Sequence, residues 1–176
     1  MQNITVRPAT LGDVAAITAI HIRASQMAYA GIMADDHLDN LSTAKRQAFW
    51  QDAIEYSEPQ VWVAMGSTKT GEKVIGFVGF DRSRDEKSKP TTGEIWAIYV
   101  EPEHWGKGVG LALWDAAREG MQEEEFTDAT LWVILQNERA LHFHEQAGFK
   151  REMNTLKTVE VGGAKLEEIR LKRSLS

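Results

Sequence analysis

The sequence predicts an α/β domain built on a mixed β-sheet, and three observations lead to this prediction. Segments with the two-residue alternation or continuous apolar character of strands are interspersed with segments whose apolar residues recur at helical spacing. The connections between them contain the glycines and polar residues typical of turns. No internal repeat, low-complexity segment or linker divides the 176 residues, so we expect one domain spanning residues 1–176.

The first half of the chain is expected to contain three strands and two helices. Residues 4–7 alternate apolar and polar side chains and end at Pro8, as a short first strand does. Thr10 and Asp13 can cap a helix that runs to about Ala30. A loop or short turn over residues 32–40, a second helix over 43–56, and two strands over 60–65 and 73–80 joined by a hairpin connection at 66–71 then follow.

The second half is expected to contain four strands and two helices. Residues 94–100 (EIWAIYV) are apolar on nearly both faces, which indicates a central strand. Gly148 ends a helix that starts at Asn137, since glycine readily adopts the left-handed conformation found after helix ends. The remaining elements are a helix over about 111–123, a strand over 130–135 and two final strands over about 149–161 and 166–173.

The composition narrows the classes of partner. The formal net charge is −6, so long-range attraction to a polyanion is unfavourable, and we expect neither nucleic acid nor an anionic membrane surface as a partner. No apolar run approaches the ~18 residues of a membrane span, and the N-terminus lacks the pattern of a signal peptide, which favours a cytoplasmic protein. The absence of cysteine excludes disulfides, zinc–thiolate sites and a thiol nucleophile, and we expect no metal.

A glycine-rich segment follows the predicted central strand. Gly106, Gly108 and Gly110 alternate with other residues immediately before a helix. Glycines allow the backbone to approach a ligand closely, and the amides at a helix start carry the positive end of the helix dipole, so this arrangement suits a phosphate group. The alternative is a tight turn without a ligand. The spacing matches neither a Walker A loop nor a dinucleotide-binding fingerprint.

A second segment begins directly after the next buried strand. Asn137 can cap the following helix or contact a ligand, and His144 lies two helical turns further on the same helix face. Read alone, the two residues fit a plain helix cap and a core or surface histidine better than they fit a ligand site.

The two segments together resemble the GNAT superfamily of acyl-CoA-dependent N-acetyltransferases, in a bacterial and uncharacterised subset. The resemblance rests on EIWAIYVEPEHWGKGVGLALWDAA and LWVILQNERALHFHEQAGF, and it is strongest over residues 94–149. It implies a GNAT-like mixed, mostly antiparallel central sheet of about seven strands flanked by about four helices. It also implies acetyl-CoA as co-substrate.

The resemblance implies the residues that would hold acetyl-CoA. The end of the central strand would bond the pantetheine arm through its backbone, and the glycine loop would wrap the pyrophosphate with its amides. Trp105 stands where the loop motif commonly has Gln or Arg. The implied cofactor-binding residues are Ile98, Tyr99, Val100, Trp105, Gly106, Lys107, Gly108, Val109, Gly110, Leu111 and Asn137.

Acetyl transfer to an amine needs help with proton movement, and two residues are candidates. Glu94 is expected to share a strand face with Trp96 and Ile98, and such apolar neighbours raise the pKa of a carboxyl, which would suit a general base. The alternative is a glutamate in solvent or in an ion pair. His144 stands where the family usually has a tyrosine that protonates the CoA thiolate. It is the candidate acid or hydrogen-bond donor to sulfur, or alternatively a substrate ligand.

The acceptor is predicted only as a class. We expect a primary amine of a small molecule, either a polyamine or an amino-acid-like compound, with Trp96 and Tyr29 as substrate-binding residues. The alternatives are a protein N-terminus or lysine, or a module that binds acyl-CoA without turnover. The acidic residues Asp35, Asp36 and Asp39 would either select a cationic amine or form a solvated edge. Small members of the family often pair, so a homodimer is compatible with the resemblance.

Overall fold

Seven strands form one sheet in the order β1-β2-β3-β4-β5-β7-β6 in the computed structural model, which describes residues 3–176. Every neighbouring pair is antiparallel except β4 and β5, which are parallel. The predicted mixed, mostly antiparallel sheet is therefore confirmed. The strands are β1 (Ile4–Pro8), β2 (Gln60–Thr68), β3 (Gly71–Arg82), β4 (Thr92–Val100), β5 (Asp128–Ile134), β6 (Lys150–Val161) and β7 (Ala164–Ser174).

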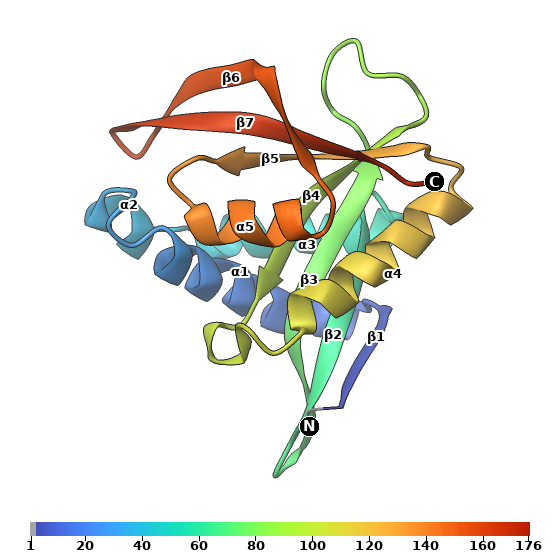
Figure 1. Cartoon of the computed structure of the whole chain (residues 1–176). Helices are drawn as coiled ribbons and strands as arrows, with labels where there is room; N and C mark the ends of the chain where they lie inside the picture. Colours follow the sequence, from blue (N-terminus) through green and yellow to red (C-terminus); the bar gives the residue numbers. More distant parts are fainter. Residues whose placement is uncertain (1–2) are drawn as a thin grey trace.

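Helices cover both faces of this sheet (Figure 1). They are α1 (Val14–Ala28), α2 (Asp35–Asp39), α3 (Thr43–Tyr56), α4 (Val109–Glu123) and α5 (Glu138–Gln146). Four of them correspond to predicted helices. Short 3-10 turns precede α1 (Leu11–Asp13) and follow β4 (Pro102–His104).

The helix α2 corrects the prediction of a loop or short turn at residues 32–40. Leu38 is buried, and its backbone amide donates to the carbonyl of Ala34. The side chain of Gln26, on α1, donates to the carbonyl of Leu38 at 3.0 Å. The buried Leu38 and the hydrogen bond from Gln26 therefore hold this short helix in place. The other four residues of α2 are polar, so the sequence shows no helical periodicity there.

Two hydrophobic clusters lie on opposite faces of the sheet. One packs α4 against residues such as Val78 and Phe80, and the other packs α1 and α3 against residues such as Val63 and Phe77. The alternation of side chains along β3 assigns consecutive residues to opposite clusters, as a pleated strand requires. The sheet is thus buried on both sides along β2, β3 and β4.

A β-bulge interrupts this alternation in β4. Gly79 pairs with Ala97 but Phe80 pairs with Ile95, so Trp96 is the extra residue. Ile95 and Ile98 consequently both pack on the α4 side, although they are three positions apart and would lie on opposite faces of a regular strand. The expectation that Glu94 shares a strand face with Ile98 is therefore wrong, because it assumed a regular two-residue period across residues 94–100.

The parallel strands β4 and β5 separate soon after they meet. They pair only where residues 92–94 of β4 lie beside residues 128–130 of β5. Beyond this point each strand continues without the other, and a gap opens at their carboxyl ends. Loops at the carboxyl ends of parallel strands are the usual place for a ligand site in α/β proteins.

Within residues 3–176, none of the helices combines the length and the hydropathy that crossing a lipid bilayer requires.

Candidate active site

A cavity of about 490 Å³ occupies the gap between β4 and β5. Its walls come from the end of α1, the second half of β4, the glycine loop, β5 and α5, so segments far apart in the chain meet there. Most of the exposed lining is apolar, as in typical small-molecule sites. The predicted residues that line it are Tyr29, Trp96, Ile98, Tyr99, Val100, Trp105, Gly106, Gly108, Gly110, Leu111, Asn137 and His144.

The glycine loop has the backbone that an anion site needs. Gly106 and Gly108 have φ angles of +74° and +85°, in the left-handed region that favours glycine. Gly108 is the N-cap of α4, and among residues 3–176 no side chain caps that helix start with a hydrogen bond. The first amides of α4 are therefore available to oxygen atoms of a ligand.

Two predicted cofactor-binding residues lie outside the cavity lining. Lys107 is exposed at the loop surface, and the side chain of Val109 is buried in the cluster under α4. Any contact that Val109 makes with a phosphate would therefore come from its backbone amide.

Trp105 closes the end of β4 instead of pointing into solvent. Its indole Nε1 donates to the carbonyl of Val100 at 2.8 Å, and the guanidinium of Arg139 lies 3.5 Å from the centroid of its ring. Burial lowers the pKa of Arg139. Arg139 lines the cavity and escaped the sequence prediction, although it follows Asn137 by only two residues on the first turn of α5. The carbonyl of Val100 keeps a second lone pair for a ligand.

Asn137 both caps a helix and lines the cavity. Its Oδ1 accepts a hydrogen bond from the amide of Ala140 at 3.2 Å, so the two alternative roles are compatible. Its side-chain NH₂ remains a donor. Tyr29 also lines this cavity, and burial, reinforced by the neighbouring Tyr99, raises the pKa of its hydroxyl. Tyr29 is thus a neutral phenol on the wall of this cavity.

His144 is a neutral imidazole at physiological pH. The side chain is buried, and its ring centroid lies 5.1 Å from that of Phe143 and 5.9 Å from that of Phe149. Burial lowers the pKa of His144 to about 4. At pH 7 the ring can therefore donate a hydrogen bond through its N–H but is not an imidazolium ion.

Glu94 is buried and fully engaged. Only 2% of the residue is exposed, and its carboxylate accepts hydrogen bonds from the amide of Arg84 at 2.9 Å, from Nε at 3.3 Å and from Nη2 at 2.6 Å. Of the two alternatives weighed for Glu94, the structure shows the ion pair. Neither cavity described here is lined by Glu94.

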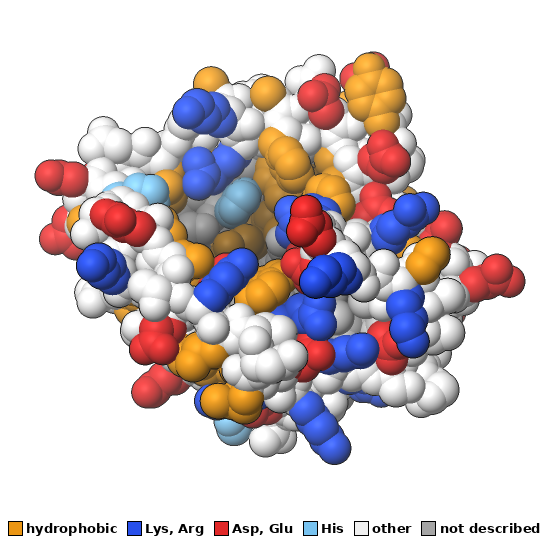
Figure 2. Space-filling model, turned by 90° about the horizontal axis from the view of Figure 1, so that it is seen from above, with side chains coloured by type: hydrophobic (Ala, Val, Ile, Leu, Met, Phe, Trp, Pro, Cys, Tyr) orange, Lys and Arg blue, Asp and Glu red, His pale blue; other side chains and the backbone are white. Residues whose placement is uncertain are grey.

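A smaller cavity of about 240 Å³ lies on the other side of the β4 bulge. It shares Trp96, Ala97 and Tyr99 with the larger cavity, and its other lining residues are His21, Phe49, Trp50 and Arg84. These four residues were not predicted, because they come from α1, α3 and the loop after β3 and share no local motif. Figure 2 shows that the face carrying this loop is hollowed, with hydrophobic side chains in the hollow and both basic and acidic side chains around it.

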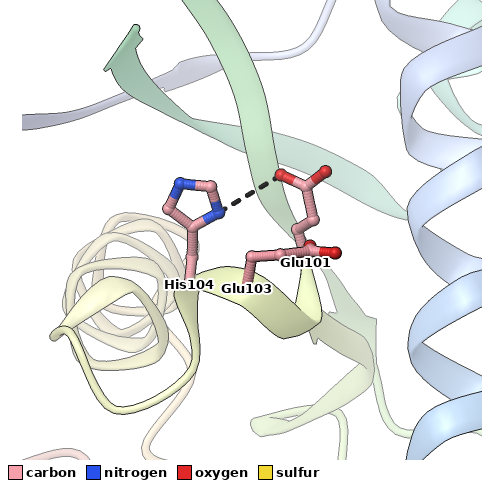
Figure 3. Close-up of side chains that lie close together, drawn as sticks. All are labelled: Glu101, Glu103 and His104. Carbon is pink, nitrogen blue, oxygen red and sulfur yellow. Dashed lines mark ion pairs between the residues drawn. The ribbon is translucent and has the colours of Figure 1, made fainter.

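A small cluster of charged residues lies beside the glycine loop (Figure 3). Glu101, Glu103 and His104 each offer a ligand atom within 4.8 Å of the others. Lys73 lies 2.9 Å from the carboxylate of Glu101, and Arg23 forms ion pairs with both glutamates. Two cations thus already neutralise the carboxylates, and the cluster ties the turn after β4 to α1 and β3.

Comparison with known proteins agrees with this geometry. The model of the acetyltransferase (GNAT) family matches residues 28–149. The uncharacterized N-acetyltransferase YuaI of Bacillus subtilis (strain 168) is 28% identical over 168 residues, covering 96% of this chain and 91% of that protein. The mycothiol acetyltransferase of Propionibacterium freudenreichii subsp. shermanii is 32% identical over 127 residues, covering 65% of this chain and 40% of that protein.

A solved structure shows the same arrangement. The structure of yncA from Salmonella typhimurium, described as a candidate acetyltransferase with its cofactor acetyl-CoA, matches with a TM-score of 0.74 at 26% identity, over 99% of this chain and 95% of that chain. The chain therefore belongs to the GNAT family. It is an acetyl-CoA-dependent acyltransferase, as the sequence predicted.

Proposed function

We propose that this protein transfers an acetyl group from acetyl-CoA directly to the primary amine of a small molecule. The observation that carries the proposal is the pair of cavities that meet at the β4 bulge, where residues 96, 97 and 99 line both. One cavity would hold the thioester and the other the amine, so that the two reactants approach each other along β4. Such positioning supplies a large part of the rate of a two-substrate reaction.

The larger cavity fits acetyl-CoA. The open backbone at Gly106 and Gly108 and the uncapped start of α4 would hold the pyrophosphate. The pantetheine arm would lie along Ile98, Tyr99 and Val100, with the side-chain NH₂ of Asn137 as a donor. Bound acetyl-CoA would supply an activated acyl group, and the chain would orient it.

The transfer forms a C–N bond and breaks the C–S bond of the thioester. The acceptor must react as its free amine, so it loses a proton, and the departing CoA thiolate finally takes one up. The 176 residues contain no cysteine, so no thioester of the protein itself lies on the route. We propose that His144 donates an N–H hydrogen bond to the thiolate as charge develops on sulfur.

The role of Glu94 as base remains a prediction. Its carboxylate would first have to release Arg84, because every hydrogen bond described for Glu94 is made with that residue. The ion pair supports a second role, in which Glu94 fixes the position of Arg84 on the wall of the smaller cavity. The two roles differ in the pH dependence of a Glu94→Gln variant.

The experiment measures release of free CoA thiol from acetyl-CoA across a panel of amines, peptides and lysine-containing proteins. We expect release with small primary amines. The small volume of the second cavity supports a small molecule over a protein substrate. If acetyl-CoA binds by calorimetry but no acceptor releases thiol, the chain is a binding module and the proposed reaction is refuted. Preference for peptides would replace the small-molecule proposal by the protein acetyltransferase alternative.

A further inference from the structure

The smaller cavity has aromatic walls that suit an apolar group. Phe49 and Trp50 come from α3, and Trp96 and Tyr99 come from β4. Trp50 is almost fully buried and packs edge-on against Phe77 behind it, so this wall is rigid. A volume of about 240 Å³ corresponds to roughly eight water molecules, which is the scale of a small metabolite.

Arg84 carries the one charge among the residues that line this cavity within the described part of the chain. Its guanidinium stacks 4.1 Å from the centroid of the Trp96 ring. Its Nε and Nη2 atoms donate hydrogen bonds to the carboxylate of Glu94. The Nη1 edge makes no hydrogen bond within residues 3–176, so this edge is available to an oxyanion ligand.

Among the described residues, the neighbouring groups add a hydrogen-bond donor and no unpaired carboxylate to this cavity. Trp50 Nε1 donates to His21 Nδ1 at 3.0 Å, so the proton of a neutral His21 ring lies on Nε2, which is a further donor. Burial, and then the positive charge of Arg46, lowers the pKa of His21 to about 4. The nearby carboxylates are already paired, Glu94 with Arg84 and Asp85 with Arg170.

We propose that the acceptor in this cavity is a primary amine that also carries a carboxylate and an apolar side chain, as an apolar amino acid does, and that Arg84 binds the carboxylate. The proposal rests on the proposed function and names the class of its acceptor. A polyamine would bring several positive charges to a wall with no free carboxylate, so this class is disfavoured. The apolar group would lie against Phe49 and Trp96.

The loop that carries Arg84 is fixed by its next residue. Asp85 accepts hydrogen bonds from Trp132 Nε1 at 3.0 Å and from Arg170 at 3.1 Å. Arg170 also pairs with Glu152 at 2.6 Å, so the loop is tied to β5, β6 and β7. Asp85 and Glu94 are therefore positioning residues that hold the guanidinium of Arg84 over the cavity.

The test compares acids with their amides as acceptors. We expect L-phenylalanine and L-leucine to be acetylated with higher kcat/KM than L-phenylalaninamide, L-leucinamide or spermidine. In Arg84→Gln, KM for the two acids should rise about 10- to 100-fold, the usual cost of losing a hydrogen bond to a charged group, while KM for the amides and for acetyl-CoA stays within twofold. Arg82→Gln is the matched control, because Arg82 is exposed and lines neither cavity.

A second measurement removes the dependence on turnover. Quenching of tryptophan fluorescence would report binding of N-acetyl-L-phenylalanine and of its amide to the protein with CoA. Tighter binding of the acid, lost in Arg84→Gln and also in the double variant Arg84→Gln/Glu94→Gln, supports the proposal. Equal use of acids and amides, or preference for spermidine, by an enzyme that releases thiol overturns it. Loss of thiol release with every acceptor, while the acid still binds, counts against the proposed function instead.

Discussion

Burial of a neutral histidine makes stability depend on pH, and His144 allows the size of this effect to be worked out. Burial lowers the pKa of His144 from 6.5 to about 4 in the folded protein. Between these values the unfolded chain binds a proton that the folded chain does not, so lowering the pH favours unfolding. The contribution of His144 to the free energy of unfolding has its full value above pH 6.5 and is lost as the pH falls toward 4. The difference of about 2.5 pKa units corresponds to an effect on the order of 3 kcal/mol, of which ~2 kcal/mol is lost by pH 5.

The assay is urea unfolding of the wild type and of His144→Phe at pH 7.5 and pH 5.0, followed by tryptophan fluorescence. Every carboxylate contributes equally to both proteins, so the comparison isolates the histidine. His144→Phe should lose ~2 kcal/mol less free energy of unfolding than the wild type over this interval. His142→Phe places the same change on the exposed side of the same helix and should follow the wild type. Equal losses in the wild type and His144→Phe would refute the reasoning.

Four further predictions concern the site. His144→Phe should lower kcat about 10²-fold and leave acetyl-CoA affinity unchanged, and an unchanged kcat would refute the proposed hydrogen bond from His144 to the thiolate. Because His144 is already neutral at pH 6, the wild-type rate should not decline from pH 6 to 8 through loss of an imidazolium. Glu94→Gln should lower the free energy of unfolding by ~2 kcal/mol, measured by urea unfolding, and raise acceptor KM, measured by steady-state kinetics. A deficit in kcat that disappears as pH rises would instead identify Glu94 as the general base. Gly108→Ala should weaken acetyl-CoA binding in calorimetry, because a φ of +85° costs an L-residue ~1–2 kcal/mol; unchanged affinity would mean that the loop does not hold the cofactor. Asp85→Asn should raise acceptor KM and leave the acetyl-CoA dissociation constant unchanged; a parallel change in both constants would contradict a local positioning role.

The fold could be predicted well because its signals are local. The buried strands and amphipathic helices show their periodicity directly, and Gly148 ends α5 with a φ of +95°, as expected. The helix α2 was missed because only Leu38 anchors it. The bulge at Trp96 was missed because residues 95–100 form a continuous apolar run, which gives no alternation in which a one-residue shift could be seen.

The two halves of the site differ in how far the sequence could predict them. The proposed cofactor half uses the end of one strand, one loop and one helix start, so the family resemblance carried by these local motifs implied most of its lining. The proposed acceptor half is assembled from α1, α3, β4 and the loop after β3, and its polar groups depend on tertiary contacts. Arg84 has no motif around it, and its position follows from an ion pair with Glu94 and from the anchoring of Asp85 to β5 and β7.

The bulge at Trp96 has a consequence for how this strand can change during evolution. Individual side chains of β4 can be exchanged for others of similar size, because each lies on a defined face. Removal of the extra residue Trp96 would restore a regular pleat and leave Ile98 and Tyr99 on their present faces, because Ile95 and Ala97 would keep their partners in β3. The strand would then lose the side chain that lines both cavities. Removal of a residue after the bulge would instead turn every later side chain of β4 over. The length of β4 is thus under stronger constraint than its composition, and natural insertions and deletions should avoid it while remaining common in the loop before it.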